Sequence, residues 1–161
     1  MVGFIFVVFI LFQQKDVILI SGYWFSCQKE DMDVHAIHAY IKRSYWAKGI
    51  PLATMEKAIN HSLCFGIFTE NNEQVAFARI ISDQATFAYM SDVYVLEEHR
   101  GKGLSKWMLK AITQHPDLQG LRRMMLATSD AHDLYQQFGF KALNAPANFM
   151  ELHQPNLYQS V

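Results

Sequence analysis

The chain has 161 residues, of which 51% are hydrophobic and 18% charged, and its formal net charge at pH 7 is -1. This length predicts one globular domain with its own core, and the near-neutral charge gives no global basic field for nucleic acid. The two cysteines, Cys27 and Cys64, lie in separate apolar runs without metal-ligand spacing. We therefore expect neither a disulfide framework nor a metal site, and we interpret both as reduced, buried residues of a cytoplasmic protein.

Residues 1–21 form an apolar N-terminal extension. Its uncharged run, residues 2–12, is shorter than the roughly 20 residues that span a bilayer, and it lacks the basic start and cleavage site of a signal peptide. An extra strand, a membrane-surface anchor, and residues upstream of the natural start are three open interpretations. We favour a segment that packs on the protein, expect no membrane contact, and place the single domain at 22–161.

The first part of the domain predicts one strand and two helices. The aromatic run 21–28 is typical of a strand. Asp33 is a candidate N-cap for a helix over 34–44, where apolar residues recur at helical spacing. Gly and Pro within 45–51 indicate a loop, and 52–62 predicts a second helix.

Three consecutive strands follow with short connections. The apolar runs are 63–70, 73–82 and 85–96. Asn71 and Asn72 suit a tight turn, because asparagine tolerates positive φ. These segments predict an antiparallel meander.

The last third predicts a helix over 104–115, a strand over 121–128 and a short helix over 131–138, with final strands over 140–143 and 148–153. The complete order is β-α-α-β-β-β-α-β-α-β-β. It indicates an α/β (α+β) domain in which about four helices cover a mixed, mostly antiparallel sheet of six to seven strands.

Two glycines and two cations separate the third meander strand from the next helix, in the order Arg100, Gly101, Lys102, Gly103. Such a junction exposes backbone N–H groups beside the positive end of a helix dipole, which favours an anion such as phosphate. A solvated turn is the alternative. A P-loop lysine motif is absent, and Lys106 occupies the third glycine position of a dinucleotide-binding fingerprint.

The segment Arg100–Ser105 resembles motif A, [Q/R]-x-x-G-x-[G/A], of the GNAT superfamily of acetyl-CoA-dependent N-acetyltransferases. Ser105 departs from the usual Gly or Ala, but its side chain is small. Thr128 replaces an Asn that often precedes the family's second pattern. The residues that match this second pattern are Ala131, Leu134, Tyr135, Gly139 and Phe140. The order of elements is also similar, from about Tyr23 to His153.

This resemblance implies acetyl-CoA as co-substrate and no metal. Its pyrophosphate is expected on the backbone of Arg100, Gly101, Lys102, Gly103, Leu104 and Ser105. Its pantetheine arm is expected along the backbone of Val93, Tyr94 and Val95, where a bulge near Asp92 or Val93 would re-aim the strand.

The resemblance further implies direct acetyl transfer to an amine in a ternary complex. Tyr135 matches the family's general acid, although a tyrosine on such a helix also suits a core position. For the general base we rank Asp92 before His132, with a water chain as a third option. We interpret Asp130 as the N-cap of the helix that carries Tyr135.

The acceptor pocket is expected between the first two helices, with Tyr45 and Trp46 as walls and with Phe87 and Tyr89 facing it. A loop plug over the core is the alternative for the first two. The sequence leaves open which small-molecule or peptide amine is accepted and whether the protein is a homodimer. A non-catalytic acyl-CoA-binding or sensor module is the alternative function.

Overall fold

The computed structural model describes residues 20–159. The apolar extension proposed for residues 1–21 therefore lies almost wholly outside the described residues. Ile20 and Ser21 are its described part, and they precede the first strand, which begins at Tyr23.

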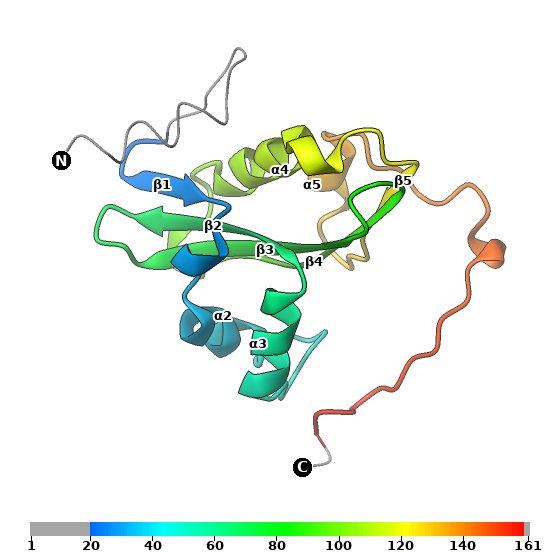
Figure 1. Cartoon of the computed structure of the whole chain (residues 1–161), viewed down its shortest axis with the longest axis horizontal. Coiled ribbons are helices and arrows are strands. Elements are labelled where there is room, and N and C mark those ends of the chain that lie inside the picture. The colour runs from blue at the N-terminus through cyan, green and yellow to red at the C-terminus, as the bar shows by residue number, and fades with distance from the viewer. Residues whose placement is uncertain (1–19, 160–161) are drawn as a thin grey trace.

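A five-stranded sheet forms the middle layer, with strands in the order β1-β2-β3-β4-β5 (Figure 1). The strands are β1 (Tyr23–Ser26), β2 (Leu63–Thr69), β3 (Gln74–Ser82), β4 (Phe87–Val95) and β5 (Arg123–Met125). Neighbouring pairs from β1 to β4 are antiparallel, whereas β5 pairs parallel to β4. The predicted meander is therefore confirmed, and the turn at Asn72 has a φ of 64°.

Helices cover both faces of this sheet (Figure 1). On one side lie α2 (Val34–Ile41) and α3 (Leu52–Asn60), and on the other lie α4 (Leu104–Gln114) and α5 (His132–Gln136). Asp33 caps α2 as expected, because its carboxylate accepts a hydrogen bond of 2.9 Å from the Ala36 N–H.

Each layer of helices buries its own apolar core against the sheet. The α4 side includes Met90, Leu109 and Ile112, all at most 2% exposed. The α2–α3 side includes Ile37 and Phe77, both fully buried. Period-two alternation in the strands supplies both cores at once, so the backbone of β4 is held firmly between them.

The two final strands expected over 140–143 and 148–153 are wrong. Within residues 20–159 the sheet has five strands, rather than six to seven, and none follows β5. Pro146 opens a 3-10 turn, which interrupts an extended run because proline lacks a backbone donor. The Phe149 ring then lies 5.0 Å from the Arg123 guanidinium, and the chain swings away from the sheet edge (Figure 1).

Among residues 20–159, no helix combines the length and the apolar character needed to cross a bilayer.

Candidate functional site

A β-bulge re-aims the middle of β4. The pairing of β3 with β4 shifts there, so that Ala78 faces both Asp92 and Val93, and Asp92 has a φ of 55°. The extra residue lets Ser91 and Asp92 both reach Arg79 on the α2–α3 side of the sheet. The bulge expected near Asp92 or Val93 is thereby confirmed.

Beyond the start of β4, the sheet separates on one side. The pairing of β4 with β5 ends where Tyr89 faces Met125, although β4 itself continues to Val95. Among the described residues, no strand pairs with this side of β4 from Met90 onward. The strand therefore offers backbone groups that an extended ligand can pair with.

The side chain of Asp92 is held from two directions. Its Oδ2 lies 2.5 Å from the Arg79 Nε, and its Oδ1 accepts a hydrogen bond of 3.0 Å from the Trp46 indole. The side chains of Arg79 and Asp92 are only 15% and 5% exposed. Because both oxygens are engaged, this geometry favours a positioning role for Asp92 over proton abstraction.

The loop between α2 and α3 carries Tyr45 and Trp46 to this position. Buried Ser44 donates to the Ile41 carbonyl at 2.7 Å, and the His38 ring bonds the Ile50 carbonyl at 2.8 Å. These contacts fix both ends of the loop, which leaves the two aromatic side chains 68% and 42% exposed.

Tyr45 connects this loop to the loop before α5. Its hydroxyl accepts a hydrogen bond of 2.9 Å from Ser129, while its ring packs at right angles to Trp46 with centroids 4.9 Å apart. The structure thus brings Tyr45, Trp46 and Asp92 into one connected group beside the helix that carries Tyr135.

Tyr135 lies on α5 and is 8% exposed, with its ring edge-to-face against Phe140 at 5.8 Å. Burial raises the pKa of its phenol to about 12, and the nearby Asp130 and Tyr45 add to the rise. The phenol therefore stays protonated at neutral pH, as a proton donor requires.

The N-cap expected at Asp130 is wrong. The N-cap of α5 is Ala131, which makes no side-chain cap bond. Instead, the Thr128 hydroxyl accepts a hydrogen bond of 3.1 Å from the Ala131 N–H. A hydroxyl closes such a turn in the way a carboxylate does, although more weakly, so Thr128 supports the start of this short helix.

Gly101 and Gly103 form an open turn before α4. Their φ angles are 76° and 82°, in the left-handed region that glycine adopts at little cost. Gly103 is the N-cap of α4 and supplies no side chain to it, while Leu104 is buried and anchors the helix. The first-turn N–H groups of the helix lack helical partners. This turn therefore has the features of an anion-binding site.

The two cations of this turn differ in their contacts. Lys102 Nζ donates to the Tyr23 hydroxyl at 2.9 Å, so its charge stays beside the turn. Arg100 folds back onto β4, where its Nε donates to the Val95 carbonyl at 3.0 Å, and its guanidinium also meets Glu97. The Arg100 backbone N–H donates to the Glu97 carbonyl, so the available N–H groups begin at Gly101.

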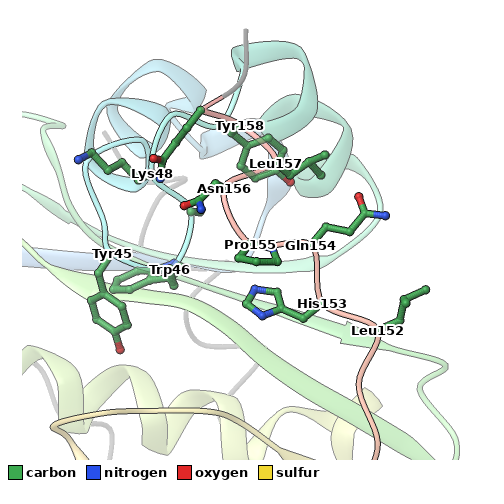
Figure 2. A pocket seen from close by; sticks show the side chains of 12 residues that line it. Tyr45, Trp46, Lys48, Leu152, His153, Gln154, Pro155, Asn156, Leu157 and Tyr158 are labelled. Atoms are coloured by element: carbon green, nitrogen blue, oxygen red, sulfur yellow. The ribbon is translucent and has the colours of Figure 1, made fainter.

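A cavity of about 510 Å³ lies between the α2–α3 loop and the C-terminal segment (Figure 2). The residues that line it are Tyr45, Trp46, Ala47, Lys48, Leu152, His153, Gln154, Pro155, Asn156, Leu157, Tyr158 and Gln159. Phe87, Tyr89 and His132 do not line it. Phe87 and Tyr89 lie on the part of β4 that pairs with β5.

Two parts of this site were missed from the sequence. Arg79 is a lone charge in the apolar run 74–82, and a charge at a buried strand position is a signal for a paired, specialised residue. His153 closes a segment that resembled a strand, and nothing in its local pattern points to a cavity. Among the described residues no group of three metal-ligating side chains occurs.

The sheet separates beside β4, where a bulge lies, and a glycine turn starts the following helix, as the resemblance of the sequence to a family implied. The model of the Acetyltransferase (GNAT) family matches residues 35–140. The chain belongs to this family.

Relatives agree with this assignment. The provisionally named acetyltransferase FG08082 of Gibberella zeae is 34% identical, over 65% of this chain and 70% of that protein. A crystal structure from Xanthomonas campestris, described as a GNAT-family acetyltransferase, is 50% identical with a TM-score of 0.85 and covers 88% of this chain and all of that one. A Clostridium acetobutylicum acetyltransferase structure with acetyl-CoA has a TM-score of 0.59 at 20% identity, over 81% and 94% of the two chains.

Proposed function

We propose that the protein transfers an acetyl group from acetyl-CoA to an amine, directly within a ternary complex. One observation carries this proposal: an open glycine turn starts α4 shortly after β4, and beyond Tyr89 the outer side of β4 pairs with no other strand among the described residues. These two features suit the two ends of an acyl-CoA, the phosphate groups and the amide-bearing arm.

Acetyl-CoA fits the residues at this place. Among residues 20–159, an added Cβ would meet nothing within 4 Å at Gly101, and at Gly103 only Ile20 at 3.8 Å, so these residues leave room for a pyrophosphate. The N–H groups from Gly101 to Ser105 would hold it, with Lys102 adding charge. The backbone of Val93–Val95 would hold the pantetheine arm. The hydrogen bond from the Arg100 side chain to the Val95 carbonyl must break before that carbonyl can bind the arm.

When bound, acetyl-CoA supplies a thioester whose carbonyl carbon accepts the amine nitrogen. The backbone N–H of Val93 is the candidate donor to the carbonyl oxygen, where negative charge develops. Tyr135 donates its phenolic proton to the sulfur as the C–S bond breaks and the C–N bond forms. The proton that the nitrogen loses on forming the amide returns to the phenolate through water, so Tyr135 ends protonated.

Asp92 serves this reaction by position. Its carboxylate joins Arg79 of β3 to Trp46 of the α2–α3 loop, so it sets where the aromatic wall stands relative to β4. His132 is exposed at the first turn of α5. We therefore assign it no contact with the acceptor.

The acceptor amine enters through the cavity bounded by Tyr45 and Trp46. Ring faces attract a cation before it loses its proton, and holding the amine there supplies proximity to the thioester. The Clostridium structure that contains acetyl-CoA supports the donor but leaves the amine open.

Thermal unfolding with added ligands tests this function, since a ligand that binds the folded state raises Tm. Acetyl-CoA is expected to raise Tm, and ATP and NAD to leave it unchanged. Release of free CoA thiol in the presence of a panel of amines then separates an enzyme from a binding module. A rise in Tm with NAD or ATP alone contradicts the proposal.

A further inference from the structure

We infer that His153, in the C-terminal segment, is the general base that deprotonates the acceptor amine. This inference rests on the proposed function and names the proton acceptor of the same site. An alkyl amine is largely an ammonium at neutral pH, because its pKa is near that of lysine, about 10.4. Its lone pair is available only after a proton leaves.

The C-terminal segment, residues 152–159, is the second wall of the cavity. It packs closely on the α2–α3 loop, since a Cβ built on Gly49 would lie 2.9 Å from the Tyr158 carbonyl oxygen. Tyr158 also packs against the core on the α2–α3 side. This contact holds the end of the segment against the loop, and His153 lines the same cavity as Tyr45 and Trp46.

Figure 2 shows how the side chains of this cavity lie. The His153 ring points toward Trp46, whereas the Lys48 ammonium points away from the C-terminal segment. Trp46 is in turn bonded to Asp92 on the bulge of β4. Because His153 and Trp46 line the same cavity, we place the imidazole on the side of β4 from which the acceptor is proposed to enter.

The titratable groups that line the cavity are Tyr45 and Lys48 from the loop, and His153 and Tyr158 from the C-terminal segment. Of these types of side chain, an imidazole serves most often as a general base. None of the described lining residues is Asp or Glu, so no carboxylate there stabilises the ammonium form of the acceptor.

The two bases ranked first from the sequence do not fill this role. Asp92 is engaged by Arg79 and Trp46, and His132 is absent from the lining of the cavity. Among the described residues that line the cavity, His153 is the one that carries an imidazole.

The proton balance is simple. The neutral imidazole of His153 takes one proton from R–NH₃⁺ and leaves R–NH₂, whose electron pair forms the C–N bond. The exposed imidazolium then releases that proton to solvent and returns to its neutral form. No further reactant is needed.

The test is the pH dependence of kcat/KM for the wild-type protein and His153→Gln, with an amine that the wild type acetylates. We expect His153→Gln to lower kcat/KM about 100-fold at neutral pH. We also expect the variant to lose the fall in kcat/KM toward acidic pH that protonation of a general base causes in the wild type. Its affinity for acetyl-CoA should stay within about twofold, because that ligand occupies the other side of the site.

His35→Gln is the matched control, because His35 is exposed on α2 and does not line the cavity. It is expected to keep the wild-type profile. A second readout is rescue: imidazole in solution should restore part of the rate to His153→Ala and leave His35→Ala unchanged.

The outcomes separate the two proposals. A wild-type protein that acetylates no amine overturns the proposed function and this inference with it. An active wild type whose His153→Gln variant keeps the same rate and pH profile overturns the inference alone.

Discussion

The Trp46 indole donates a hydrogen bond of 3.0 Å to the carboxylate of Asp92, which joins the α2–α3 loop to the bulge of β4. In the proposed reaction, acetyl-CoA lies beside the bulge and the loop forms a wall of the acceptor pocket. One buried carboxylate would then set the distance between these two parts of the site.

Substitution of Arg79 tests how much its ion pair with Asp92 stabilises the fold. Arg79→Ala leaves the Asp92 carboxylate, whose side chain is 5% exposed, without its counter-charge, and should lower the free energy of unfolding by about 3 kcal/mol. Arg43→Ala is the control, because its ion pair with Glu97 has side chains 55% and 47% exposed, and its loss should change stability much less. Urea unfolding measures both, and equal effects would contradict the assigned role.

The glycine turn can be tested by a pair of substitutions with similar backbone strain. Gly101 and Gly120 have φ angles of 76° and 71°, and a Cβ on either meets no described residue within 4 Å. Alanine at each should cost about 1 kcal/mol of stability. Only Gly101→Ala should also weaken acetyl-CoA binding, about tenfold or more, in isothermal titration calorimetry. Equal affinities for the two variants would remove the turn from the binding site.

Tyr135→Phe should separate chemistry from binding. The phenylalanine keeps the ring packed against Phe140 but cannot protonate the departing sulfur, so kcat should fall about 100-fold or more. The dissociation constant for acetyl-CoA should change by less than about twofold. Steady-state release of CoA thiol measures kcat, and calorimetry measures the dissociation constant. An unchanged kcat would show that Tyr135 has a purely structural role.

The raised pKa of Tyr135 also predicts a stability change at alkaline pH. The folded phenol titrates at about 12, whereas an unfolded tyrosine titrates near 10. The unfolded state therefore loses its proton first, and this stabilising contribution is complete below about pH 10 and disappears as the pH rises through about 12. Below about pH 10, the difference in unfolding free energy between wild type and Tyr135→Phe should be constant. Above about pH 10, the wild type should lose stability relative to Tyr135→Phe. A difference that stays constant throughout contradicts the burial of the phenol.

Tyr94 offers a stabilising substitution. Its hydroxyl is buried without a hydrogen-bond partner among the described residues, while its ring stacks on Tyr40 with centroids 3.9 Å apart. Tyr94→Phe should raise the free energy of unfolding by up to about 1 kcal/mol, since it removes an unsatisfied polar atom. Tyr40→Phe should be neutral or destabilising, because that hydroxyl accepts from Arg100. Chemical denaturation checks both, and a clear loss of stability in Tyr94→Phe would contradict the finding.

Local patterns predicted the parts of the fold that depend on local chemistry. Asp33 indicated the start of α2, and the alternation within β2, β3 and β4 indicated the meander, because capping and period-two burial act over a few residues. Local patterns failed for the C-terminal segment, for which we expected two strands. It has apolar residues at strand spacing, but a strand also needs an edge to pair with, which no local pattern reports.

The candidate site also combines features that local sequence predicts with features that depend on long-range contacts. The open turn at Gly101 and the bulge at Asp92 were expected from the motif and its resemblance to a family. The pairing of Asp92 with Arg79 depends on the register between two strands, and the position of His153 depends on the fold of a long segment over Gly49. Such long-range relationships required the structure.

We propose that this chain moves an acetyl group from acetyl-CoA to an amine. The most direct measurement is mass spectrometry of a mixture of the full chain, acetyl-CoA labelled with carbon-13 in the acetyl group, and a broad panel of amines. We expect at least one amine to gain the labelled acetyl group, with an equal amount of free CoA, and a large loss of both products in Tyr135→Phe. Acetyl-CoA that stays intact with every amine, or CoA that is released without any labelled amine, would contradict the claim.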